Sequence, residues 1–219
     1  MTEQYPGLRS GRSHNVEPLA LVYPPYLKLH QECEILVDSM LGKLAHWLRL
    51  LGLKTDFSKE FCDSEIVHRE EVLVTRDRNL FINRMRVSKD SILILSQNIK
   101  NQLVPILLLI DKVPSKVPVF KYCTVCGGYL YEVPREHVWG KVPDRVFNRY
   151  ERFWVCSKCG KVYWAGSHHK NMMKLFREVL DLLKHVDSVI LRFQEHACRL
   201  IILHNSGVTS PAEVAEEYV

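Results

Sequence analysis

Two cysteine pairs of the same form constrain this chain more than any other feature. The first is Cys123-Thr-Val-Cys126-Gly and the second is Cys156-Ser-Lys-Cys159-Gly. Each pair can present two sulfur atoms to one ion, and the glycine that follows permits a tight turn. Four thiolates form a closed tetrahedral shell, which is typical of structural rather than catalytic zinc. The sequence therefore predicts a small zinc-stabilised module around these cysteines.

Two redox-active dithiols are the alternative, but neither pair lies in a thioredoxin-like context. The chain has seven cysteines, an odd number, and metal thiolates fit a reducing intracellular compartment, cytoplasmic or nuclear, better than a disulfide framework does. We expect Cys33, Cys62 and Cys198 to be free thiols. His168 and His169 follow the second pair and are expected at the surface, because four cysteines already complete a tetrahedral shell.

The segment before the cysteines alternates between short apolar runs and helical patterns. The expected strands are 35–37, 54–57, 72–74 and 92–95, and the expected helices are 41–51, 63–68, 79–85 and 98–110. This alternation predicts βαβ units and a parallel sheet, so the expected fold class is α/β. A membrane span needs about 20 apolar residues, and the sequence has no such run, so we expect no membrane partner.

Composition divides the chain further. We expect a flexible leader at 1–32, an α/β domain at 33–111, a zinc module at 112–171, and a helical C-terminal extension with its tail at 172–219. Residues 112–170 hold 11 Lys and Arg against 4 Asp and Glu, whereas the whole chain has a net charge of only +5. The zinc module is therefore the basic part, which favours a polyanionic partner. The C-terminal helices are expected to pack on the α/β domain or to recruit a protein partner.

Acidic residues follow the predicted strands. Asp38 and Asp77 each come after a buried strand, and Asp63 and Glu65 open the short helix between them. The carboxyl ends of parallel strands share one edge, so these carboxylates can converge there and hold Mg²⁺ or Mn²⁺. Two such ions about 4 Å apart would activate water against a phosphodiester. The alternative roles are helix N-caps for Asp38 and Asp63, a turn for Asp77 and a first-turn position for Glu65.

Basic and aromatic residues accompany the acids. Lys43, Arg49, Arg76 and Arg78 can bind the phosphates of a nucleic acid, or they can form a solvated helix face and salt bridges to the acids. The aromatic residues of the zinc module can stack on bases, although such residues more often build the core of a small module. They are Tyr129, Tyr131, Trp139, Phe153, Trp154, Tyr163 and Trp164.

Three strings of the sequence carry a family resemblance. They are the strand and helix at 35–52, the segment Val72-Leu-Val-Thr75-Arg76-Asp77-Arg78, and the stretch from Cys156 to His168. Together they resemble the mut-7 C-terminal RNase-domain family, over about residues 34–173. The resemblance implies a PIN-like nuclease fold with an appended zinc ribbon.

That resemblance also implies residue roles. Asp38 is the first acid, Asp77 is the acid of a Thr-x-Asp motif, and Asp63 or Glu65 is the middle acid. Lys43 and Arg49 match basic positions of the helix motif. The implied activity is hydrolysis of RNA or single-stranded nucleic acid by a nuclease related to 3′–5′ exonucleases, with Mg²⁺ or Mn²⁺ as the catalytic metal.

Two other functions stay open. The first is a nucleic-acid-binding or protein-adaptor module with a degenerate nuclease fold. It is favoured by Asn79, which stands where many relatives carry another acid, and by the short segment 63–77. Such a module would bind RNA in a salt-sensitive way without turnover. The second is a purely structural zinc-stabilised domain, which would neither bind nor cleave RNA.

Overall fold

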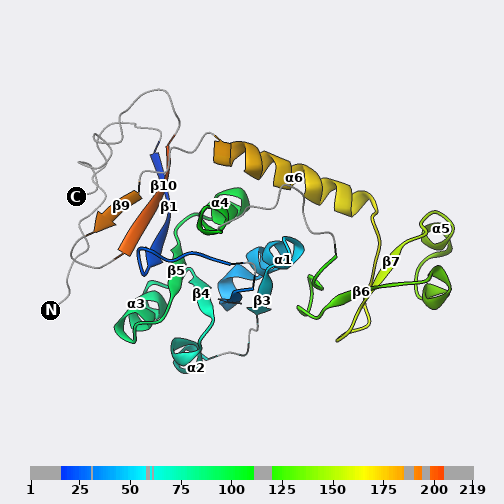
Figure 1. Ribbon diagram of the computed structural model, residues 1–219, viewed down its shortest axis with the longest axis horizontal. Coiled ribbons are helices and arrows are strands. Elements are labelled where there is room, and N and C mark those ends of the chain that lie inside the picture. Colours follow the sequence, from blue (N-terminus) through cyan, green and yellow to red (C-terminus); the bar gives the residue numbers. More distant parts are fainter. Residues whose placement is uncertain are drawn as a thin grey trace.

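A computed structural model describes residues 16–30, 32–57, 60, 62–110, 120–184, 190–193 and 198–204. A seven-stranded mixed sheet in the order β3-β2-β4-β5-β1-β10-β9 organises most of them (Figure 1). Its strands are β1 (Val16–Tyr23), β2 (Glu34–Val37), β3 (Lys54–Phe57), β4 (Val72–Thr75), β5 (Ser91–Ile94), β9 (Ile190–Phe193) and β10 (Cys198–His204).

Four of these strands, β2 to β5, are parallel and are connected by helices. The helices are α1 (Gly42–Leu50), α2 (Asp63–His68), α3 (Arg78–Arg86) and α4 (Ile99–Leu109). A short 3₁₀ turn, η1 (Ser39–Leu41), precedes α1. The expected α/β class with a parallel sheet flanked by helices is confirmed.

Helices cover both faces of the parallel strands (Figure 1). Ile35 and Val37 point into a core that α1 and α4 share, whereas Leu36 points into a second core with α2 and α3. Successive strand residues face opposite sides, so a strand covered on both faces must be apolar throughout. This requirement explains the unbroken apolar runs in the sequence.

The expectation of a flexible leader is wrong for residues 16–30. Strand β1 pairs antiparallel with β5 on one side and with β10 on the other, with Val22 opposite Ile92. Leu19, Ala20 and Val22 are completely buried. Strand β1 therefore covers the edge of β5, which would otherwise expose unpaired main-chain groups. Residues 1–15 lie outside the described part of the chain.

The expectation of a helical C-terminal extension holds only up to Lys184. Helix α6 (Ser167–Lys184) packs Phe176 and Val179 into the main core, on the side of α4. Residues 190–193 and 198–204 form the antiparallel pair β9 and β10 instead of a helix. The apolar run Leu200-Ile-Ile-Leu203 includes two β-branched residues, which favour a strand, and its main chain pairs with β1 in the sheet. The tail 205–219 lies outside the described residues.

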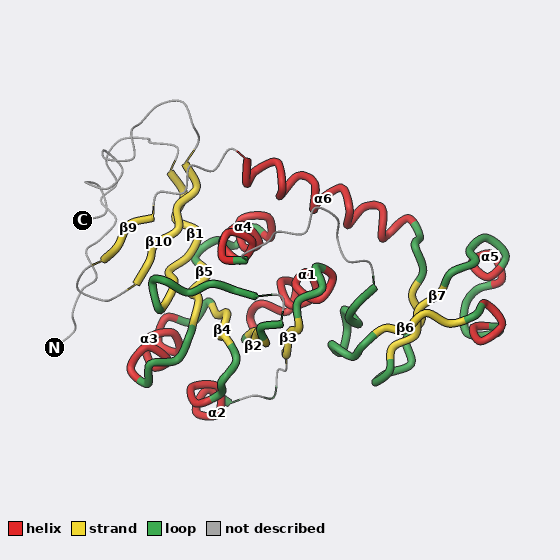
Figure 2. The backbone as a smooth tube through the Cα atoms, in the orientation of Figure 1, coloured by secondary structure: helices red, strands yellow, loops and turns green. Residues whose placement is uncertain are grey.

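The cysteine module is a separate unit with its own sheet (Figure 2). Its strands are β6 (Leu130–Val133), β7 (Phe153–Cys156) and β8 (Val162–Tyr163), all antiparallel. A 3₁₀ turn, η2 (Arg135–Val138), and α5 (Asp144–Phe147) lie between β6 and β7. Phe153 and Val138 are fully buried in its small core. Helix α6 runs from this module across α4 toward the β1 side of the large sheet (Figure 2). No helix in the described ranges is long and apolar enough to span a membrane.

Candidate functional site

The four cysteine sulfurs come together at one point of the module. All four Sγ atoms lie within 4.8 Å of one another. The Cys123 and Cys159 sulfurs are 3.7 Å apart, and those of Cys126 and Cys156 are 3.4 Å apart. A tetrahedral ion with metal–sulfur bonds of about 2.3 Å requires sulfur–sulfur distances of about 3.8 Å. Among the residues that the structure describes, this is the only compact group of candidate metal ligands, and it can hold a zinc ion.

Each cysteine pair sits in a turn that a glycine closes. Gly127 and Gly160 adopt φ values of +71° and +70°, a conformation that L side chains rarely adopt. Their N–H groups donate to the carbonyls of Cys123 and Cys156, at 2.9 Å and 3.0 Å. The turns therefore orient the sulfurs by local main-chain geometry alone.

The thiols differ in acidity because their surroundings differ. Burial raises the pKa of Cys123, but hydrogen bonds from the Tyr163 hydroxyl and from the N–H groups of Cys126 and Val125 outweigh it and lower the pKa to about 6. Burial raises the pKa of Cys126 to about 12. A metal ion that binds these cysteines must displace the protons that remain on the thiols.

Arg49 joins this module to the α/β domain. Its side chain is only 2% exposed, and its Nε donates to the Thr55 carbonyl of β3 at 3.0 Å. Its Nη1 donates to the carbonyls of Thr124 and Val125, between the first two cysteines, at 3.2 Å and 2.8 Å. Desolvation by burial lowers the pKa of Arg49. The structure thus places Arg49 inside the molecule as a connector, away from the surface where a phosphate would approach.

The parallel strands define a second candidate site at the topological switch point of the sheet, which is the place where the strand order reverses. β2 and β4 are neighbours, yet the chain leaves β2 toward the face covered by α1 and leaves β4 toward the face covered by α3. In doubly wound sheets, ligands bind beyond the carboxyl ends of such strands. Asp38 directly follows β2, and Asp77 lies two residues beyond the last residue of β4.

Thr75 connects these two acids. The Asp38 carboxylate accepts hydrogen bonds from the Thr75 hydroxyl and from the Arg76 N–H, the latter at 3.0 Å. The Asp77 N–H donates to the Thr75 Oγ1 at 2.8 Å. Thr75 is fully buried, and sequence reasoning assigned it no role. The Thr-x-Asp motif was the signal that could have identified it.

Both acids also cap helical turns. The Asp38 carboxylate accepts from the Met40 N–H at 2.7 Å at the start of η1, and the Asp77 carboxylate accepts from the Leu80 N–H at 3.0 Å at the start of α3. The N-cap role considered for Asp38 is therefore present. A carboxylate has about four lone-pair positions, so the three bonds that Asp38 accepts and the one that Asp77 accepts leave capacity to bind a cation.

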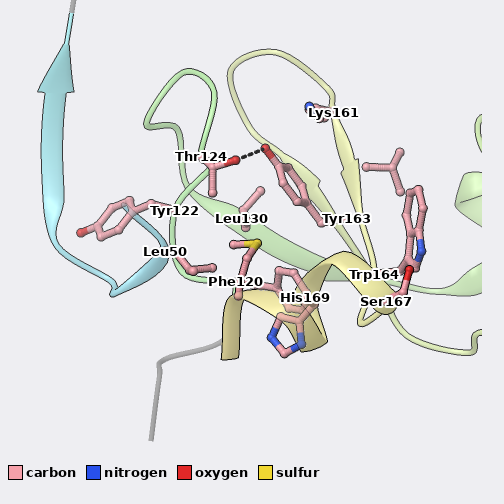
Figure 3. A pocket seen from close by; sticks show the side chains of 13 residues that line it. Leu50, Phe120, Tyr122, Thr124, Leu130, Lys161, Tyr163, Trp164, Ser167 and His169 are labelled. Atoms are coloured by element: carbon pink, nitrogen blue, oxygen red, sulfur yellow. Dashed lines mark hydrogen bonds between the residues drawn. The ribbon is translucent and has the colours of Figure 1, made fainter. Parts of the chain in front are cut away.

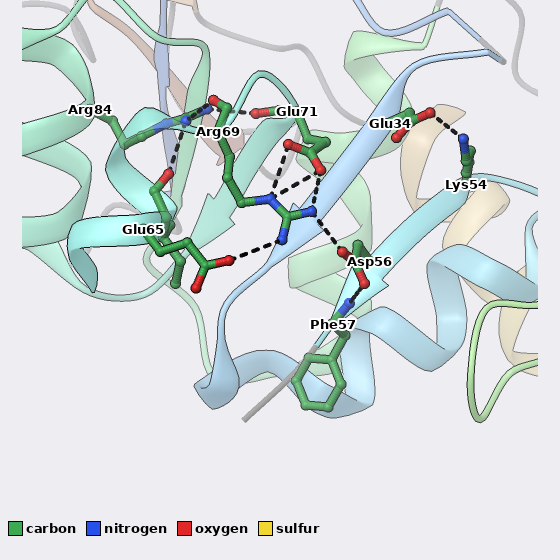
Figure 4. A network of polar contacts seen from close by, with 9 residues as sticks. Glu34, Lys54, Asp56, Phe57, Glu65, Arg69, Glu71 and Arg84 are labelled. Atoms are coloured by element: carbon green, nitrogen blue, oxygen red, sulfur yellow. Dashed lines mark hydrogen bonds and ion pairs between the residues drawn. The ribbon is translucent and has the colours of Figure 1, made fainter. Parts of the chain in front are cut away.

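The two middle acids lie on α2 and are exposed. Glu65 faces Arg69, 3.9 Å away, and that guanidinium also binds Asp56 at 2.8 Å and Glu71 (Figure 4). Asp63 occupies the first turn of the same helix. The structure thus joins Asp38 to the main chain of Asp77 through Thr75 and places Glu65 in the Arg69 network. It does not bring three of the four predicted acids, all of which lie in the described ranges, into one compact group of metal ligands.

Three of the four predicted phosphate-binding residues are close in sequence to Asp38 or Asp77. Their exposure to solvent differs. Lys43 in the first turn of α1 and Arg78 at the start of α3 are exposed, and Arg76 is half-buried beside Asp38. Arg49 alone is buried, as described above.

The fold and these two sites define a class of protein: a doubly wound α/β domain with acids at its switch point, joined to a four-cysteine module. A family model described as the Mut7-C RNAse domain matches residues 33–176, more than half of the chain. The chain therefore belongs to the Mut7-C RNAse domain family, and the resemblance seen in the sequence is confirmed. The family description indicates a nuclease-type function. Searches of curated proteins and of solved structures found no match to this chain.

Proposed function

We propose that this protein is a metal-dependent ribonuclease, with Asp38 and Asp77 as the principal ligands of a Mg²⁺ or Mn²⁺ ion. The observation that carries the proposal is the connection of these two acids through Thr75 at the switch point of the sheet. Carboxylate oxygens are the ligands that these hard cations prefer. When bound there, the metal would activate water and stabilise the negative charge of the phosphodiester.

Neighbouring groups orient the Asp38 carboxylate at this edge of the sheet and place positive charge close to it in the sequence. Thr75 and the Arg76 N–H hold one oxygen of Asp38, and the Met40 N–H holds the other, so the carboxylate has a fixed orientation. The exposed side chains of Lys43 and Arg78 are placed to neutralise the phosphates of RNA. As third acid we propose Asp63 over Glu65, because the Glu65 carboxylate faces Arg69.

We propose further that the α/β domain is PIN-like and that the cysteine module is a zinc ribbon. The order β3-β2-β4-β5, with acids beyond β2 and β4, supports the first assignment. The two glycine-closed pairs and the sulfur separations support the second. In such a ribbon, the zinc ion is structural and would stabilise the three short strands and aid nucleic-acid binding.

A second candidate function is RNA binding without turnover. Two observations favour it: Glu65 is paired with a guanidinium, and Asn79, an exposed amide, stands in the first turn of α3 next to Asp77. The α/β domain would then serve as a scaffold for the basic cysteine module.

The test is cleavage of a fluorescent single-stranded RNA by the zinc-loaded chain while Mn²⁺ is titrated. Asp38→Asn should lower the rate more than about 100-fold, because loss of an outer-shell partner alone costs about 10- to 100-fold. Asparagine is as good an N-cap as aspartate, so this variant keeps the helix start while removing the charge. Asp144→Asn, at an exposed acid of α5, is the matched control and should retain full activity.

Metal dependence is measured by omitting Mn²⁺ rather than by adding a chelator, so that the cysteine site stays loaded. RNA cleavage that is unchanged in Asp38→Asn would exclude the ribonuclease site proposed here. Salt-sensitive RNA binding with no cleavage at any Mn²⁺ concentration would establish the second function instead.

A further inference from the structure

A pocket of about 350 Å³ lies where three parts of the chain meet (Figure 3). Leu50 contributes from the end of α1, Tyr163 and Trp164 from the end of the cysteine module, and Met172 from α6. Asp38 precedes the opposite end of α1. Leu50 lies twelve positions after Asp38, which corresponds to about 18 Å at 1.5 Å per helical residue. The pocket is therefore distinct from the acidic switch point.

Aromatic rings form much of the pocket wall. Phe120, Tyr122, Tyr163, Trp164 and His169 all line it. Each of them is a flat surface, and none is fully exposed to solvent. Base–aromatic stacking tolerates any sequence because every base has a π face. Walls of this kind suit a planar aromatic ligand.

A few polar groups accompany the rings. The hydroxyls of Thr124 and Tyr163 lie 3.4 Å apart at one side of the pocket (Figure 3). Ser167 adds a third hydroxyl at the start of α6. Lys161 is exposed at the rim, with its ammonium 5.8 Å from the centre of the Tyr163 ring. An apolar cavity with few convergent polar groups is the usual form of a ligand site.

Phe120 is held in a conformation that costs energy. Its φ is +62°, in the left-handed region that bulky residues rarely adopt. Its ring stacks on Trp154 at a centroid distance of 4.2 Å and on His169 at 5.3 Å. Such strain persists only where the surrounding structure imposes it, and it concentrates at functional sites. Here it fixes the ring in the wall of the pocket.

We propose that this pocket binds one nucleobase of single-stranded RNA and so anchors the strand away from the scissile phosphate. The inference rests on the proposed function and names a second contact for the same substrate. The rings would stack on the base, the hydroxyls of Thr124 and Ser167 would contact its polar edge, and Lys161 would pair with the adjoining phosphate. The surrounding segment 112–170 carries 11 Lys and Arg against 4 Asp and Glu, which is complementary to a polyanion.

The experiment measures RNA binding in the Asp38→Asn background, so that cleavage does not interfere. A fluorescent 12-nucleotide RNA is compared with versions that carry one abasic position each. Trp164→Leu and Lys161→Ala should each weaken binding, the former by roughly 5- to 100-fold, as expected for loss of one stacked base. The controls are Tyr26→Leu, at an exposed aromatic residue outside the cysteine module, and Lys141→Ala, at an exposed residue of the module outside the pocket, and both should bind as the parent does.

The abasic series separates the base from the backbone. One abasic position should weaken binding to the parent and have no further effect in Trp164→Leu, because the two changes remove the same contact. This coupling remains measurable even if Trp164→Leu lowers stability, provided that circular dichroism shows a folded chain at the assay temperature.

Three results would overturn the pocket proposal. The first is equal binding by Trp164→Leu and Tyr26→Leu, the second is an abasic series without effect, and the third is a loss confined to Lys161→Ala, which would indicate a phosphate contact alone. Failure of the proposed nuclease function would show differently, as absent cleavage by the native chain with base-dependent binding intact.

Discussion

The guanidinium of Arg49 donates a 2.8 Å hydrogen bond to the main-chain carbonyl of Val125 and so joins the last turn of α1 to the first cysteine pair. The same side chain also binds the Thr55 carbonyl of β3. Gly127 favours this approach, because a Cβ there would lie 3.1 Å from the Thr55 carbonyl oxygen and 3.3 Å from the Arg49 Nε, and these neighbours would have to move by a few tenths of an ångström. The two parts of the protein are thus connected through a buried charge, and α1 begins just after Asp38.

Arg49→Met should lower the free energy of unfolding by about 2–4 kcal/mol, because carbonyls at the contact lose a charged donor and become unsatisfied. Urea denaturation measures this change. Arg86→Met, at an exposed arginine of α3, is the control and should stay within about 0.5 kcal/mol of the native chain. A similar small change for Arg49→Met would show that the connection does not contribute to stability.

Removal of the metal from the cysteine cluster should unfold the cysteine module. Cys126→Ser removes one of the four ligands, and the short strands β6 to β8 then depend on a very small core. We expect one zinc ion per native chain by elemental analysis, and rapid proteolysis within residues 120–166 in the variant. Cys62→Ser changes an exposed thiol outside the cluster and should leave zinc content and protease resistance intact. A native chain that binds no zinc would contradict the prediction.

Arg84 should be among the most sensitive positions of the α/β domain. It is fully buried, and its guanidinium donates to main-chain carbonyls around α2 and before β5. These are the carbonyls of Ile66, Val67, Arg69, Glu71 and Asp90. Arg84→Met should cost about 3–5 kcal/mol, because several buried carbonyls lose their donor and each unsatisfied group costs about 1–3 kcal/mol.

Arg84→Lys should be intermediate, since an ammonium has fewer donors than a guanidinium. Thermal and urea unfolding rank the three chains, and yield of soluble protein serves as a second readout if Arg84→Met does not fold. Equal stability of Arg84→Met and the native chain would show that these hydrogen bonds contribute little.

Protonation of Glu71 should lower the free energy of unfolding at acidic pH. The hydrogen bond from Arg69 lowers the pKa of Glu71 below its ordinary value of 4.5 (Figure 4). A lowered folded-state pKa means that the unfolded chain binds the proton first, so the stabilisation is complete above pH 4.5 and is lost as the pH falls through the folded-state pKa.

Glu71→Gln should therefore be less stable than the native chain at about pH 7, and the difference should shrink at about pH 3. Urea denaturation at several pH values measures it. Glu136→Gln, at an exposed acid of the cysteine module, is the control for the substitution itself and should stay within about 0.5 kcal/mol of the native chain at neutral pH. A difference that is constant with pH would indicate that Glu71 acts through packing and not through its charge.

Local sequence patterns determined the strands and helices of the parallel sheet and the cysteine cluster of this protein. The apolar runs of β2, β4 and β5 and the helices between them were predictable, because a strand covered on both faces must be apolar and a helix between parallel strands shows a 3.6-residue period. The cysteine cluster was predictable for the same reason: the ligands of each pair are close in sequence, and a glycine closes each turn.

Tertiary structure decided what depends on partners distant in sequence. Residues 16–23 and 198–204 carry only short apolar stretches, which do not distinguish strand from helix. They become neighbouring strands because β1 covers the edge of β5 and β10 covers the edge of β1. Arg49 has the sequence context of a surface arginine, and only the approach of the cysteine module buries it. Hydrogen bonds and burial between remote segments are settled by packing, which no periodicity within one segment can encode.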